Sequence, residues 1–136
     1  MSSLYNVSLG IVSAAHLLFG LGNLFKVPPY DPASFMVAGK PGTGDTPMEK
    51  LLEAVFGGWY TSSIIGVLLA YFSGSSSTLR STLVCPLIYH IMSSCVAVLF
   101  LEKWNVCNKA KTSAAMIGGF HSLMSLLFGY LYCMTS

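Results

Sequence analysis

The chain has 136 residues, of which 9% are charged and 54% are hydrophobic, and its mean hydropathy is +0.67. Soluble domains carry about 25% charged residues, so this chain has too few charges to cover a water-exposed surface, and the composition predicts a membrane protein. The net charge of +2 is too small to indicate a nucleic-acid partner.

The first apolar segment covers about residues 5–25. No basic region precedes it, so it is predicted to be a retained membrane span and not a cleaved signal peptide. A helix needs about 20 apolar residues to cross the 30 Å hydrocarbon core of a bilayer, and this segment is of that length.

The second apolar segment covers about residues 51–73 and follows a helix-start pattern. Thr46 at the N-cap, Pro47 at the first helical position and Glu49 two residues later form a capping box, so the helix is expected to begin near Pro47 and to continue through Phe72. Every fourth residue of the segment is small: Ala54, Gly58, Ser62, Gly66 and Ala70. Such a stripe lets a neighbouring backbone approach closely, which indicates either a tight bundle or a docking face for a larger partner.

The third and fourth apolar segments cover about residues 81–101 and 112–133. Pro86 lies inside the third segment, which therefore either starts late as a helix or is kinked at the proline. The fourth segment carries a shorter small-residue stripe of Ala114, Gly118 and Ser122, for which the same helix-packing role is expected.

These four segments predict an all-α fold, a bundle of four transmembrane helices that forms a single domain over residues 1–136. The first and third connections hold six basic residues, Lys26, Lys40, Lys50, Lys103, Lys109 and Lys111, whereas the second holds only Arg80. The positive-inside rule then predicts that both termini lie on the outer side of the membrane.

Three of the four segments each carry one histidine near the middle: His16, His90 and His121. Each shares its helix face with small or polar residues, and ionisable side chains avoid lipid, so the three are expected to face inward at one depth. The main interpretation is that they join helices through hydrogen bonds. The alternatives are axial ligation of a haem or chlorophyll by two of the histidines, or a path for protons or substrate.

The remaining polar residues form no catalytic arrangement, so the chain is predicted not to be an enzyme. Glu53 is the only acid inside an apolar segment, and its expected role is a favourable first-turn charge at the helix N-terminus. The four cysteines show neither a C-x-x-C pair nor a zinc spacing, so no metal site is expected. A disulfide between Cys85 and Cys133 is left open.

The stretch EAVFGGWYTSSIIGVLLAYF, an acidic residue before a glycine-rich span, resembles the second span of the small four-helix DoxX-like membrane proteins. Its FGGWYTSS portion is also similar to the four-helix scaffold family of ergosterol synthesis, which tethers enzymes in the endoplasmic reticulum. These resemblances imply a small carrier or an enzyme scaffold.

The expected function is a non-catalytic integral membrane subunit that packs against a larger energy-converting assembly, such as an accessory subunit of a respiratory chain. Its expected partners are lipid and other membrane subunits, with no nucleic acid and no cofactor. The mitochondrial inner membrane is the expected location, with the endoplasmic reticulum and the thylakoid as alternatives. A haem- or pigment-binding redox subunit is the second hypothesis.

Overall fold

The computed structural model describes residues 2–25, 47–100 and 108–136. Four helices make up this part of the chain: α1 (Ser3–Phe25), α3 (Pro47–Phe72), α4 (Ser76–Phe100) and α5 (Asn108–Met134). Each of the four is long and apolar enough to cross a membrane, which confirms the predicted fold class. Each of the four predicted segments overlaps one of these helices, although α4 begins at Ser76, before the predicted start near residue 81.

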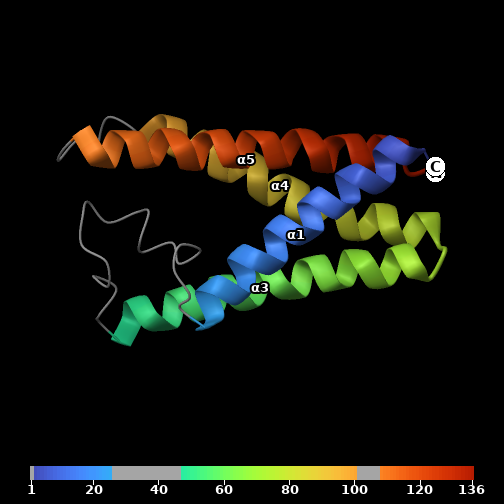
Figure 1. Cartoon of the computed structure of the whole chain (residues 1–136), viewed down its shortest axis with the longest axis horizontal. Helices are drawn as coiled ribbons and strands as arrows, with labels where there is room; N and C mark the ends of the chain where they lie inside the picture. Colours follow the sequence, from blue (N-terminus) through green and yellow to red (C-terminus); the bar gives the residue numbers. More distant parts are fainter. Residues whose placement is uncertain (1, 26–46, 101–107) are drawn as a thin grey trace.

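The helices run alternately in opposite directions, so both termini and the turn between α3 and α4 lie at one end of the bundle (Figure 1). The most extensive contacts join α1 to α3 and α4 to α5, and smaller contacts join α3 to α4 and α1 to α5. The bundle is therefore two antiparallel pairs packed together. The side of the membrane on which the termini lie stays a prediction.

Serine caps start two of the helices. Ser2 Oγ accepts the backbone N–H of Tyr5 at 3.2 Å, and Ser75 Oγ accepts that of Thr78 at 3.3 Å. These oxygens satisfy backbone donors that have no partner within the helix. Between α3 and α4 the chain reverses at Gly74, whose φ of 71° lies in the left-handed region that glycine adopts without strain.

The predicted start of the second helix at Pro47 and its end at Phe72 agree with the bounds of α3. Thr46, the predicted cap, lies outside the described residues, and so does most of the first connection. Helix α4 begins at Ser76 and continues through Pro86, so the alternative of a late helix start is wrong. Pro86 itself is fully buried in the bundle.

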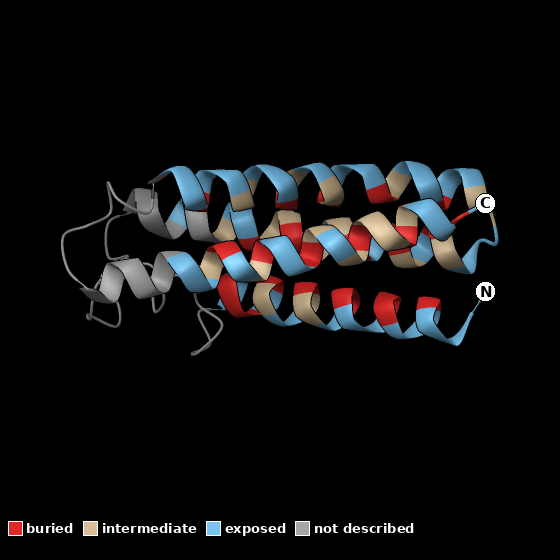
Figure 2. Cartoon of the chain, turned by 90° about the horizontal axis from the view of Figure 1, so that it is seen from above, coloured by how far each residue is buried: buried red, intermediate tan, exposed pale blue. Residues whose placement is uncertain are grey.

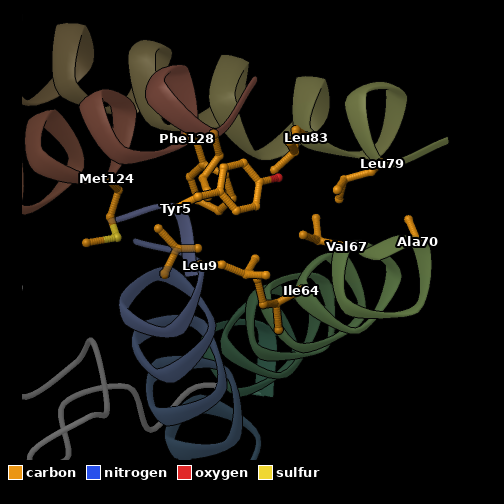
Figure 3. Close-up of a cluster of buried hydrophobic side chains, with 11 residues drawn as sticks. Tyr5, Leu9, Ile64, Val67, Ala70, Leu79, Leu83, Met124 and Phe128 are labelled. Atoms are coloured by element: carbon orange, nitrogen blue, oxygen red, sulfur yellow. The ribbon is translucent and has the colours of Figure 1, made fainter. Parts of the chain in front are cut away.

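Residues coloured as buried lie mainly on the helix faces that are turned toward the other helices, and exposed residues lie mainly on the outer faces (Figure 2). A hydrophobic cluster fills the half of the bundle nearest the termini, with Tyr5, Val67, Leu83 and Phe128 among its members (Figure 3). The Tyr5 hydroxyl also bonds Thr135 Oγ1 at 2.8 Å, which ties the two ends of the chain together. Because lipid gives no hydrophobic drive between helices, close packing and such hydrogen bonds must hold the bundle together.

The exposed surface is strongly apolar. Leu69, Phe72, Val98 and Leu126 are among many large hydrophobic side chains that are about two-thirds or more exposed. Such a surface would be an aggregation hazard in water, whereas lipid tails solvate it. The structure is therefore compatible with an integral membrane protein.

Candidate functional site

The three histidines meet at the centre of the bundle. His16 on α1 and His90 on α4 are fully buried, and His121 on α5 is 7% exposed. Their predicted inward orientation is therefore confirmed. Sequence alone places them at one depth, and the structure shows that they also touch.

Direct hydrogen bonds join the three rings into a chain. The Nδ1 atoms of His90 and His121 are 2.7 Å apart, and the Nε2 atoms of His90 and His16 are 3.1 Å apart. At the far end, His16 Nδ1 lies 2.9 Å from the carbonyl oxygen of Val12, one turn earlier in α1. The order along this chain of hydrogen bonds, which we call the histidine chain, is therefore Val12 carbonyl, His16, His90, His121.

These bonds determine which nitrogen of each neutral ring carries the proton. A carbonyl oxygen only accepts, so His16 Nδ1–H donates to Val12 and His16 Nε2 is an acceptor. His90 must then donate from Nε2 to His16, which leaves His90 Nδ1 as the acceptor for Nδ1–H of His121. Three neutral rings thus satisfy every bond of the chain without a buried charge.

Aromatic rings surround the histidine chain. The Phe128 ring stacks on His90 at a centroid distance of 5.6 Å and an interplanar angle of 16°, and it meets His16 edge-on at 5.1 Å. Tyr60 of α3 lies 5.1 Å from the His16 ring, and its hydroxyl donates to Tyr89 Oη at 3.2 Å. This packing fixes the ring orientations that the hydrogen bonds require.

In this arrangement the two hydrogen-bonded pairs, His90–His121 and His90–His16, are too close for the rings of either pair to flank one metal-centred cofactor. Imidazole nitrogens lie about 2 Å from a bound metal such as zinc, so two that flank a metal are about 4 Å apart. The observed pairs, at 2.7 Å and 3.1 Å, are at hydrogen-bond distance instead. The described residues contain no group of three or more side chains placed to hold a metal ion. Ligation of a tetrapyrrole by either pair therefore needs a different arrangement of the rings.

The predicted small-residue stripe of α3 is partly buried in the bundle. A Cβ atom built on Gly58 or on Gly66 would meet nothing within 4 Å, and Ser62 is exposed. Of the five stripe positions, Ala70 is buried and Ala54, Gly58 and Gly66 are half-buried. At its centre the stripe makes no close contact among the described residues, so the alternative of a docking face for a larger partner stays open, and the packing role of the stripe stays a prediction.

Within the bundle, α3 approaches α1 most closely at the neighbouring glycine, Gly57. A Cβ on Gly57 would lie 2.7 Å from the Gly20 carbonyl oxygen and 2.8 Å from the backbone nitrogen of Leu24. A Cβ on Gly20 would in turn lie 2.9 Å from the backbone nitrogen of Thr61. The sequence shows both glycines, but spacing alone does not say which of Gly57 and Gly58 faces α1.

The small residues of α5 do lie against another helix. A Cβ on Gly118 would be 3.3 Å from the Ala97 Cβ, and Ser122 Oγ bonds Ser94 Oγ at 2.6 Å across the α4–α5 interface. The side chains of Ala114 and Glu53 lie outside the described set. Cys85 and Cys133 are free, exposed thiols, so the structure contains no disulfide between them.

Comparisons with protein-family models, with curated proteins and with solved structures find no match to this chain. The resemblance to DoxX-like proteins and to the ergosterol scaffold family therefore stays a prediction. Function has to be argued from the residues themselves.

Proposed function

We propose that the protein is a non-catalytic integral membrane subunit that binds a transmembrane helix of a larger membrane complex. The observation that supports this proposal is the small-residue face of α3 at Gly58, Ser62 and Gly66, where Ser62 is exposed, the two glycines are half-buried, and a Cβ built on either glycine meets nothing within 4 Å among the described residues. Glycine in a helix costs about 1 kcal/mol relative to alanine in water. Among the described residues nothing lies within 4 Å of a Cβ built on Gly58 or Gly66, so the bundle itself does not require a glycine at either position.

The chemistry of this face suits an apolar helix. Ser62 Oγ donates to the carbonyl oxygen of Trp59 at 3.1 Å, so its hydroxyl is already satisfied within the helix. Val55, Ile65 and Leu69 flank the small residues and are 45–66% exposed. A partner helix could contact the α3 backbone between these larger side chains, which is the geometry that small residues permit in membranes.

The larger complex is proposed to be an energy-converting assembly of the mitochondrial inner membrane, with both termini of this subunit on the outer side. The proposal rests on the four apolar helices that make up nearly all of the described residues and on the charge bias of the connections between the apolar segments.

The test is purification in mild detergent from the native membrane, followed by native gel electrophoresis and identification of co-migrating proteins. We expect the wild-type chain to migrate with a large complex and the double variant G58L/G66L to migrate alone as a small particle. G119L is the matched control, because Gly119 also has nothing within 4 Å of a built Cβ but lies on α5. A solitary wild-type particle, or an unchanged complex with G58L/G66L, would overturn the proposal.

A further inference from the structure

The histidine chain has one open end. Of the six ring nitrogens of His16, His90 and His121, five make hydrogen bonds, and Nε2 of His121 makes none within the described part of the chain. In the neutral chain this nitrogen holds a free lone pair. His121 is also the one of the three that has any exposure, at 7% against 0% for the other two.

We propose that these three histidines form a proton relay, which accepts a proton at His121 Nε2 and passes the charge inward to His16. This role goes beyond that of a packing subunit and rests on different residues. The donor is a hydronium ion or another oxygen acid that reaches the His121 end of the chain.

Each step of the relay conserves atoms and charge. The incoming proton forms an N–H bond at His121 Nε2, and the Nδ1–H bond of His121 breaks as its proton moves to His90 Nδ1. The Nε2–H bond of His90 then breaks as that proton moves to His16 Nε2. His16 ends with protons on both nitrogens, its Nδ1–H still donating to Val12, while the other two rings are neutral again. The reverse sequence returns the proton to the donor.

The surroundings suit a shared proton. The titratable groups that face the chain are Tyr60 from α3 and Tyr89 from α4, both within ring contact of a histidine. Phe128 and Phe120 cover it from α5. No charged side chain is among the described ring neighbours of the histidines. A positive charge on one buried imidazole is costly, and hydrogen-bonded partners that share the proton reduce this cost.

The first experiment follows ¹⁵N-histidine NMR signals of the protein in lipid nanodiscs during acid titration. At neutral pH we expect His16 and His121 with protonated Nδ1 and His90 with protonated Nε2. On acidification we expect the ¹⁵N signals of all three rings to shift over the same pH range. Protonated Nε2 on neutral His16 or His121, or an acid response confined to His121, would overturn the proposal.

The variant H90Q separates a relay from a purely structural role. A glutamine amide can accept from His121 and donate to His16, but it does not exchange a proton between its nitrogen and oxygen as imidazole does. We expect the acid response of H90Q to stay at His121, whereas an unchanged response at His16 would contradict a relay. S94A, which removes a different hydrogen bond of the α4–α5 interface, serves as the matched control and should titrate like the wild type.

A second measurement needs no variant at histidine. Diethyl pyrocarbonate acylates imidazole nitrogens that carry an accessible lone pair. We expect it to modify His121 alone in the wild-type protein and to abolish the acid response of His16 and His90. Modification of His16 or His90 before His121, or a His16 response that survives capping of His121, would overturn the proposal.

Discussion

The adjacent glycines of α3 point about 100° apart around the helix axis and have different surroundings. Gly57 contacts the backbone of α1 so closely that a single added carbon would collide with it, whereas a carbon added to Gly58 would meet nothing within 4 Å. The same contrast continues along the helix, since Ile64 is 1% exposed and Ile65 is 45% exposed. One face of α3 builds the bundle, and the other is left for lipid or for another protein.

This difference shows that a small-residue stripe identifies a face that can be approached closely, without saying what approaches it. The inward face holds a single contact glycine and large residues such as Tyr60 and Ile64, which fill the remaining space. The less buried face holds the regularly spaced Gly58, Ser62 and Gly66. Regular spacing is what a partner helix running along α3 would require, whereas α1 needs a glycine only where it approaches α3 most closely.

The largest expected effect comes from leucine at the inward glycine. G57L should destabilise the bundle by about 3 kcal/mol or more, because overpacking costs about 1–3 kcal/mol where flexible side chains can move and here backbone atoms are in the way. G58L should leave the stability of the bundle unchanged. Titration with sodium dodecyl sulfate, followed by Trp59 fluorescence, measures both, since the Trp59 ring packs 4.3 Å from the Tyr89 ring. Equal stability of the two variants would break the distinction between the faces.

The next effect compares two neighbouring isoleucines. I64A should lower the free energy of unfolding by about 2 kcal/mol. This is the lower end of the range for large-to-small core substitutions, because lipid adds no hydrophobic transfer term. I65A should change the free energy of unfolding, measured by the same detergent titration, by less than about 0.5 kcal/mol, as is usual for surface positions. A larger loss for I65A than for I64A would place the core on the wrong face.

A smaller effect is expected for the hydroxyl groups of the two faces. Y60F removes the bond to Tyr89 between α3 and α4 and should cost about 1 kcal/mol, the usual net value of one hydrogen bond. S62A removes only a bond to its own helix and should be nearly neutral. Thermal unfolding in a mild detergent would show the difference, and a greater loss with S62A would argue against it.

The smallest effect is expected at Thr61. Its Oγ1 is buried and has no hydrogen-bond partner among the described residues, so an isosteric valine removes an unsatisfied polar atom there. T61V should therefore be neutral or slightly stabilising. A clear loss of stability in the same unfolding assay would show that this oxygen has a partner, such as a buried water.

The helices and the inward histidines could be predicted from the sequence because both follow from short-range rules. Apolar length determines the spans, and the cost of an ionisable group in lipid turns His16, His90 and His121 toward the protein. Their mutual bonds could not be predicted, because sequence does not give the rotation of one helix against another. The same missing rotation explains why Gly57 and Gly58 could not be told apart, and why the bond from Tyr5 to Thr135 was not expected.

The most direct test of the two-faced α3 helix is photocrosslinking in the native membrane. A photoreactive phenylalanine analogue is placed at Ser62 on the outward face and, as a control, at Leu123, which is 52% exposed on α5. We expect a crosslink from position 62 to a second polypeptide and none from position 123. A crosslink from position 62 to α1 of the same chain, or to lipid alone, would contradict this expectation.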